Sequence, residues 1–236
     1  MTDLYMTNIP LDLASLRRIA ATRGYENDEG LALHHLLSEA FGKSVLQPFR
    51  LMAAKGANLY AYTSVDLATL CETVRDVATP DTLSLLSIDE IKQKAMPTDW
   101  AAGKRLGFEL KTRPVRRLKE PAGKFKKGSE IDAYLLEALR HSKDNATKVG
   151  SRNSVYADWL ARRLSDVATV DQLRIRRIQQ TSIQRGSFRQ TGPEVVYMGN
   201  ITIKNSSEFQ KKLTSGVGRH CAYGYGMLLL RPLNSR

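Results

Sequence analysis

The sequence predicts an α+β fold made of two tandem βαββαβ units. Its 236 residues suit two domains of about 100 residues each, and a hydrophobic share of 42% is enough for packed cores. Hydrophobic periodicity gives the order βαββαβ up to residue 118, and a second, looser pass follows. This order is the ferredoxin-like, or RRM-like, pattern.

The first unit is expected at residues 1–118, and turn and cap residues delimit its elements. Gly24 and Gly42 end the first two helices, Asn27-Asp28-Glu29 offers an N-cap and an acidic first turn, and Lys55-Gly56 supplies a turn between two strands. The expected elements are a strand at 4–9, helices at 11–23 and 27–41, strands at 49–52 and 58–62, a helix at 65–78, short helical pieces within 81–97 and a long strand at 105–118.

A linker is expected at residues 119–128, because this stretch holds Pro121, Gly123 and four lysines. The second unit then covers residues 129–236. Its expected elements are helices at 130–141 and 155–165, a loop at 142–153, strands at 173–184 and 195–204 around a basic hairpin centred on Gly186, a helix at 206–213 and a last strand at 227–231.

Charge is distributed unevenly along the chain. Residues 1–103 carry nine Lys/Arg against thirteen Asp/Glu, whereas residues 104–236 carry twenty-seven against eleven. A net charge of +12 concentrated in one half indicates a nucleic-acid surface confined to that part of the molecule. A generally basic protein without such a surface is the less specific alternative.

Several classes of protein are excluded by composition. No apolar run approaches the roughly 18 residues of a membrane span, and the first residues show no export signal. Cys71 and Cys221 are the two cysteines, which favours a reducing cytoplasm over a disulfide scaffold, and no metal-ligand spacing is present. We therefore expect a cytoplasmic protein without a cofactor, a metal or a membrane partner.

The tail at residues 216–226 (GVGRHCAYGYG) is rich in glycine and leads into the last strand. Glycines allow positive φ, and successive free N–H groups can cradle a phosphate. A dinucleotide-binding loop would lie between a strand and a following helix, whereas the order here is helix, loop, strand. The loop therefore favours the phosphodiester of a nucleic acid, with Gly216, Gly218, Arg219 and His220 as contacts, and a nucleotide-dependent enzyme is the weakest alternative.

This tail resembles the C-terminal motif of the CasE family of CRISPR repeat RNA endonucleases, which serve the Cascade complex. The resemblance continues in the family's order through residues 33–41 (LHHLLSEAF), 106–117 (LGFELKTRPVRR), 156–164 (YADWLARRL) and 195–203 (VVYMGNITI). It covers most of the chain, and it implies the same two tandem ferredoxin-like units.

His34 is the candidate catalytic residue. It lies at the edge of the buried stripe of its helix, and an imidazole titrates near neutral pH, which suits proton transfer. A lone histidine is more often structural, but in the family the residue that matches His34 is catalytic. His35 projects to a more polar side, where it could pair with Glu39. Many members have a tyrosine three residues before the histidine, where this chain has Leu31.

Arginines are expected to hold the RNA, because a guanidinium binds phosphate in a bidentate manner and duplex RNA is recognised largely through its backbone. We expect about half of the candidates to touch RNA. Besides Arg219 and His220 of the glycine loop, the candidates are Arg113, Arg116 and Arg117 at the end of the strand at 105–118, and Arg174, Arg176, Arg185 and Arg189 in the basic hairpin.

The resemblance implies a metal-independent endoribonuclease, of type I-E or of a related class 1 complex, that processes CRISPR precursor RNA within the repeat hairpin. The 2′-OH would attack the phosphate, giving 2′,3′-cyclic phosphate and 5′-OH ends, and the enzyme would remain on the mature guide RNA with the other Cascade subunits. Because Leu31 replaces the family's tyrosine, the alternative is a non-catalytic subunit that binds the repeat hairpin.

Overall fold

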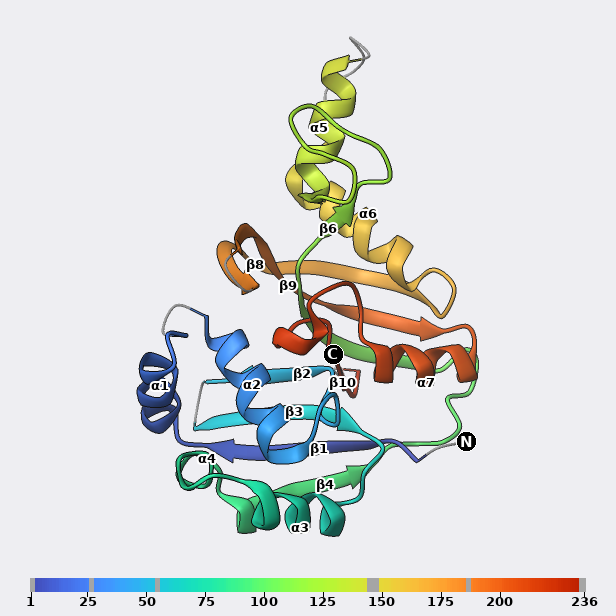
Figure 1. Ribbon diagram of the computed structural model, residues 1–236. Helices are drawn as coiled ribbons and strands as arrows, with labels where there is room; N and C mark the ends of the chain where they lie inside the picture. The colour runs from blue at the N-terminus through green and yellow to red at the C-terminus, as the bar shows by residue number, and fades with distance from the viewer. Residues whose placement is uncertain (1–2, 26–27, 54–55, 144–148, 186–187, 234–236) are drawn as a thin grey trace.

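Two four-stranded antiparallel sheets form the body of the protein, as the sequence predicts (Figure 1). The computed structural model describes residues 3–25, 28–53, 56–143, 149–185 and 188–233. The strand orders are β2-β3-β1-β4 and β10-β5-β9-β8. In both sheets the first and third strands of the unit are central, so the tandem ferredoxin-like fold is confirmed.

The first sheet and its helices come from residues 5–95. Asp28 caps α2, because its Oδ1 accepts the amide of Leu31 at 2.9 Å, and Gly42 ends that helix with φ of 92°. The elements are β1 (Tyr5–Leu11), α1 (Leu13–Thr22), α2 (Glu29–Phe41), β2 (Phe49–Met52), β3 (Ala57–Thr63), α3 (Leu67–Val77), α4 (Pro80–Leu85), the 3₁₀ turn η1 (Ile88–Glu90) and β4 (Lys92–Ala95).

The second sheet begins at β5 and carries a long hairpin, β8–β9. In the described part of the chain, no helix is long and apolar enough to cross a bilayer. The elements are β5 (Arg105–Thr112), β6 (Val115–Arg117), β7 (Glu130–Asp132), α5 (Ala133–Lys143), α6 (Arg152–Leu164), β8 (Ala168–Arg185), β9 (Phe188–Ile203), α7 (Ser206–Ser215), the 3₁₀ turn η2 (Cys221–Tyr223) and β10 (Leu228–Arg231). The expected cap Asn27 and the expected turn residues Lys55 and Gly186 lie outside the described residues.

The expected end of the first unit at residue 118 is wrong. Residues 105–112 form β5, which pairs with β9 and β10 at the centre of the second sheet. The fourth strand of the first sheet is β4, at 92–95, where we expected helical pieces. Three of its four residues are exposed, and its sequence, KQKA, lacks the alternation that marks a half-buried strand.

The expected linker is also a different structure. Residues 118–129 connect β6 to β7, which pair with each other, and the amide of Leu118 donates to the carbonyl of Ser129 at 2.9 Å. Together with α5, these strands form an excursion between β5 and α6 that projects from the second sheet (Figure 1). The excursion has its own small core of Leu118, Ile131 and Leu136.

Buried contacts join the two sheets. The Tyr62 hydroxyl of β3 donates to the carbonyl of Leu228 in β10 at 2.9 Å. Arg50 of β2 donates to Glu109 of β5 at 2.9 Å, and both side chains are largely buried. Because Tyr62 lies in the same hydrophobic core as residues of the second unit, the two units are packed together rather than linked loosely.

Candidate functional site

His34 lies in the middle of α2, half-buried, with its backbone held by the helix. Burial lowers its pKa below the ordinary value of 6.5, and the charges of His35 and Lys43 lower that pKa further. The imidazole is therefore mainly neutral at pH 7, which suits the acceptance of a proton.

Tyr223 of the glycine loop packs beside His34. The centres of the two rings are 5.1 Å apart, and their planes are tilted by 41°. The approach depends on Gly30 in the first turn of α2, because a Cβ there would lie 2.5 Å from the carbonyl oxygen of Tyr223. The two ends of the chain thus meet at one site, and sequence reasoning missed Tyr223 because 189 residues separate it from His34.

The glycines of the loop are needed for close packing. Gly216, Gly218, Gly224 and Gly226 all have positive φ. A Cβ on Gly216 would lie 2.7 Å from Cys221 Sγ, and one on Gly218 would lie 2.9 Å from Thr112 Oγ1. The Gly216 amide donates to the carbonyl of Lys212, so it ends α7 and is occupied within the protein.

Arg219 and His220 both bind the carboxylate of Glu130 in β7, and we call these two contacts the Glu130 clamp. Arg219 Nε donates to one carboxylate oxygen at 2.6 Å, and His220 Nε2 lies 2.7 Å from the other. The hydrogen bonds from both partners lower the pKa of Glu130 to about 2, although burial opposes this shift. His220 is buried, so the structure assigns it to this clamp rather than to the surface expected for RNA.

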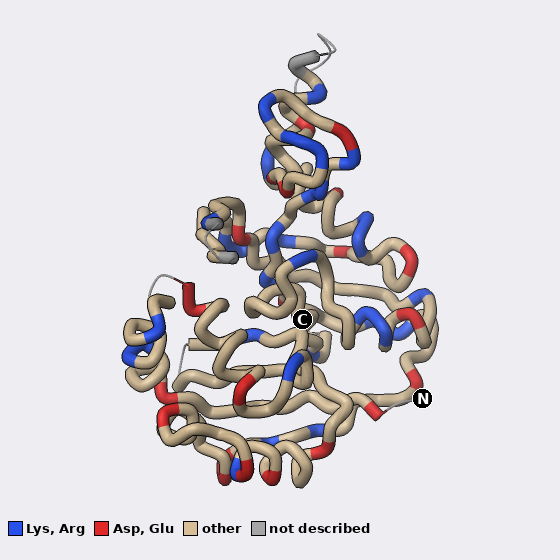
Figure 2. The backbone as a smooth tube through the Cα atoms, in the orientation of Figure 1, with Lys and Arg blue, Asp and Glu red and all other residues tan. Residues whose placement is uncertain are grey.

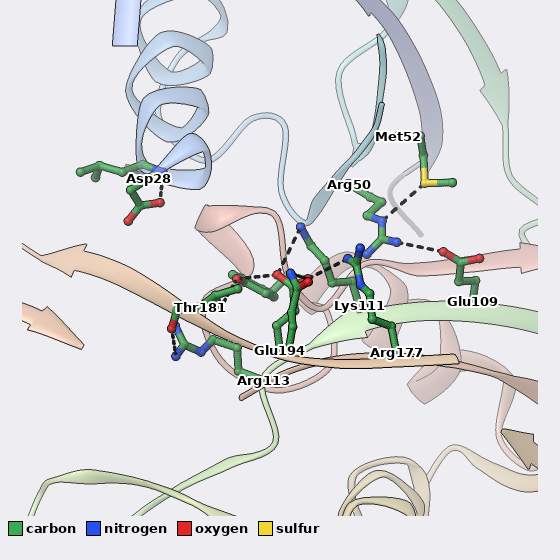
Figure 3. Close-up of polar contacts among 12 residues, drawn as sticks. Asp28, Arg50, Met52, Glu109, Lys111, Arg113, Arg177, Thr181 and Glu194 are labelled. Carbon is green, nitrogen blue, oxygen red and sulfur yellow. Dashed lines mark hydrogen bonds and ion pairs between the residues drawn. The ribbon is translucent and has the colours of Figure 1, made fainter. Parts of the chain in front are cut away.

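Glu194 of β9 organises a second polar cluster, which sequence reasoning missed (Figure 3). Its carboxylate accepts hydrogen bonds from Arg177 at 2.9 Å, Gln179 at 2.8 Å and Tyr225 at 2.9 Å, and Lys111 Nζ lies 4.0 Å away. Tyr225 belongs to the glycine loop, so the cluster ties the loop to the long hairpin. An isolated acid in a basic strand pair is the one signal in the sequence that could have indicated it.

Arg113 is also placed inside the protein, not on an RNA-facing surface. It is 1% exposed, and its Nη2 donates to the carbonyl of Thr181 at 3.1 Å (Figure 3). Gly192 leaves room for it, because a Cβ there would lie 2.6 Å from the guanidinium. The expectation that Arg113 contacts RNA is therefore corrected to a role in packing the hairpin against β5.

Asp28 connects the hairpin to the helix that carries His34. One carboxylate oxygen caps α2 at Leu31, and the other accepts the amide of Gln184 in β8 at 2.7 Å. The hairpin and the first turn of α2 therefore share one carboxylate. A cavity of about 320 Å³ lies beside this link, but its lining includes Asp28, Glu29 and Glu194, which disfavours an anion there.

The predicted arginines of the hairpin whose side chains are described lie on the surface. Arg174 and Arg176 are exposed on β8, and Arg176 lies 3.7 Å from Glu109. Arg189 is exposed on β9, whereas the side chain of Arg185 lies outside the described residues. Figure 2 shows lysines and arginines gathered on the excursion, and Arg116 and Arg117 of β6 line a groove there. Cationic side chains therefore lie on both the hairpin and the excursion.

The neighbours of His34 on α2 have structural contacts. His35 stacks on Tyr25, with ring centres 5.0 Å apart, and Glu39 pairs with Arg23 at 2.8 Å rather than with His35. Leu31 is buried, so it leaves no polar group where the family's tyrosine would stand. Within the described residues, no group of three His, Cys, Asp or Glu could hold a metal ion.

Comparison with known proteins gives one consistent result. A family profile described as CRISPR associated protein matches residues 4–232. Among curated protein sequences, none matches the chain significantly. The family profile therefore detects a similarity that comparison with individual curated sequences does not.

Solved structures with the same fold cover nearly the whole chain. Thermus thermophilus Cse3, bound to an RNA representing a pre-cleavage complex, is 18% identical with a TM-score of 0.66, covering 98% of this chain and 100% of that one. Cas6e from Escherichia coli K-12 is 16% identical with a TM-score of 0.59, covering 97% and 100%. A chain of a CRISPR RNA-guided surveillance complex is 15% identical with a TM-score of 0.55, covering 97% and 100%.

Replacing Glu130 by glutamine tests the clamp on the glycine loop. We expect Glu130→Gln to lower the free energy of unfolding by about 2 kcal/mol at pH 7, because two charge-assisted hydrogen bonds are weakened. The folded-state pKa of Glu130 is depressed, so its contribution is present above the ordinary carboxyl pKa and disappears as the pH falls towards 2.

Urea unfolding at several pH values measures this difference, with Glu72→Gln on the exposed face of α3 as the control. The difference in free energy of unfolding between Glu130→Gln and the wild type should become smaller as the pH is lowered. A difference in free energy of unfolding that stays constant between pH 7 and pH 3 would contradict the assignment of Glu130 as the partner of Arg219 and His220.

Proposed function

The chain belongs to the CRISPR-associated protein family, and from this premise we propose that it is a metal-independent endoribonuclease that cuts CRISPR precursor RNA within the repeat hairpin. The observation that carries the proposal is the contact between the rings of His34 and Tyr223 of the glycine loop. The fold is that of Cse3 and Cas6e endoribonucleases, and the Thermus protein of this fold is bound to RNA.

In the proposed reaction, the 2′-OH next to the scissile phosphate gives its proton to the neutral imidazole of His34. The 2′-oxygen forms a bond to phosphorus and the P–O5′ bond breaks, and the departing 5′-oxygen takes a proton from solvent water, which leaves a 2′,3′-cyclic phosphate and a 5′-OH. The lowered pKa of His34 supports its role as the base.

Tyr223 is the candidate that takes the place of the family's tyrosine. Leu31 is buried and cannot supply a hydroxyl, whereas the Tyr223 ring packs against the ring of His34. We assign the Tyr223 hydroxyl to a hydrogen bond with the reacting 2′-OH or phosphate oxygen, which would stabilise the developing charge.

Product retention follows from the placement of the charges. Cleavage below a hairpin leaves the hairpin on the 3′ end of the product, so contacts with the cationic surfaces survive the reaction. The proposed enzyme thus stays on the guide RNA and joins a Cascade-type effector complex, in line with the same fold in a surveillance complex.

Substitution of His34 tests the reaction. We expect His34→Ala to slow cleavage of the cognate repeat by at least about a hundredfold, because the general base is lost, while affinity stays nearly unchanged. Single-turnover cleavage in EDTA, with binding measured in parallel, gives both quantities. Full activity in the variant would refute the mechanism, and wild-type activity that requires a divalent ion would refute metal independence.

Binding of the repeat by the wild type with no cleavage at long times would favour the alternative, a non-catalytic subunit that binds the repeat hairpin. The burial of Leu31, where the family has a tyrosine, is the observation that keeps this alternative under test.

The pH dependence tests the direction of proton transfer. Because the neutral imidazole is the active form, the single-turnover rate should rise with pH through an apparent pKa below 6.5 and reach a plateau by neutral pH. Rates at saturating protein, with folding checked at each pH, measure this profile. A rate that declines as the pH rises through this range would assign His34 as the acid instead.

Removal of the Tyr223 hydroxyl tests its assignment. Tyr223→Phe keeps the ring against His34 and should slow cleavage by roughly tenfold to a hundredfold, because one donor to the developing charge is lost. Tyr25→Phe is the matched control, since Tyr25 stacks on the neighbouring His35. Equal cleavage rates for Tyr223→Phe and the wild type would remove the hydroxyl from the mechanism.

A further inference from the structure

A groove of about 950 Å³ lies between the excursion and α6, away from His34. Leu118 and Leu136 of the excursion and Trp159 of α6 contribute apolar lining. The charged lining is almost wholly cationic, with Glu120 as its one acid, and consists of Arg116, Arg117, Lys119, Arg140, Arg162, Arg163 and Arg219.

Most of this positive charge is not neutralised within the protein. Among the described residues, Arg116, Lys119, Arg162 and Arg163 have no carboxylate partner. Burial lowers the pKa of Arg116, and the nearby charge of Arg162 lowers that pKa further, whereas the charge of Glu137 partly opposes the shift. Like charges held together in a groove cost free energy unless an anion binds between them.

The groove holds part of its cationic surface in fixed positions. Arg163 lies over the ring of Trp159, with 5.5 Å between the guanidinium carbon and the ring centre. Arg117 Nε donates to the carbonyl of Gly128 at 3.2 Å, and Arg219 is held by Glu130. Less side-chain entropy is therefore lost when these groups bind a ligand.

The groove is continuous with the glycine loop of the proposed active site. Gly218 and Arg219 line the groove, and Tyr223 of the same loop contacts His34. The Glu130 clamp fixes Arg219, so the loop joins the two regions through a short, constrained stretch of backbone. A polyanion that lies at His34 and follows this loop reaches the groove.

We propose that this groove binds the sugar–phosphate backbone of the substrate RNA at a distance from the bond that is cut, and so holds the product after cleavage. This inference rests on the proposed function and adds to it a binding site formed by Arg140, Arg162 and Arg163, together with Arg116 and Lys119. Arginine forks match phosphate geometry, and the apolar floor can lie against ribose.

An RNA strand fits the groove better than an acidic protein surface does. The continuity with the loop beside His34 places the groove on the path of the substrate itself. The excess of positive charge in residues 104–236 also matches the long, regular charge of a nucleic acid. An acidic segment of another subunit is the competing occupant, and the experiment separates the two.

The test removes two adjacent arginines of the groove. R162A/R163A should weaken binding of the cognate repeat RNA by roughly tenfold or more and reduce the slope of log affinity against log salt by about 2, because two phosphate contacts are lost. The single-turnover cleavage rate at saturating protein should equal that of the wild type, since neither residue touches the reacting atoms.

Two further variants complete the design. R17A/R18A removes an adjacent pair of exposed arginines from α1, and it should keep wild-type affinity and salt slope. R162K/R163K keeps the charge and should retain the slope while losing part of the affinity. Melting temperatures of all variants show whether R162A/R163A is folded, and R162K/R163K carries the test if it is not.

The proposal would be overturned if R162A/R163A bound the repeat RNA with the affinity of the wild type and with the same slope of log affinity against log salt. Normal RNA binding with loss of assembly into the effector complex would overturn it in favour of an acidic protein partner. A wild type that binds RNA without cutting it would refute the endoribonuclease, yet the affinity of R162A/R163A would still decide whether RNA occupies the groove.

Discussion

The contact between the backbone of the glycine loop and the first turn of α2 is the constraint on which the candidate site depends. Only a residue without a side chain at Gly30 allows the Tyr223 carbonyl to come this close. The loop can take this path because its glycines adopt positive φ, and it is held from both sides by Glu130 and Glu194. The two carboxylates stabilise the approach that Gly30 permits.

This arrangement changes how the glycine loop is understood. A run of glycines next to basic residues suggests an open phosphate cradle, but here Gly216 and Gly218 are needed because neighbouring atoms leave no room for a Cβ. The loop acts first as a support that positions Tyr223 and Arg219. Any contact with RNA is made from a backbone that the protein itself holds in place.

The sequence was sufficient to predict the tandem fold, because periodic helices and long hydrophobic strands carry strong local signals. It failed at β4, whose polar residues show no alternation, and consequently assigned β5 to the wrong sheet. The helix position of His34 was predictable, but the burial of Arg113 and His220 was not. Their partners lie 68 and 90 residues away, beyond the reach of any local pattern.

The separation of His34 and Tyr223 along the chain also bears on folding kinetics. Each sheet pairs strands from its own half of the chain, within residues 5–95 and 105–231. The contact between α2 and the glycine loop closes across both halves, so its entropic cost is met only after the sheets are formed. We expect the packing of Tyr223 against His34 to form later than sheet structure during refolding, which would leave a folding intermediate with both sheets but without this contact.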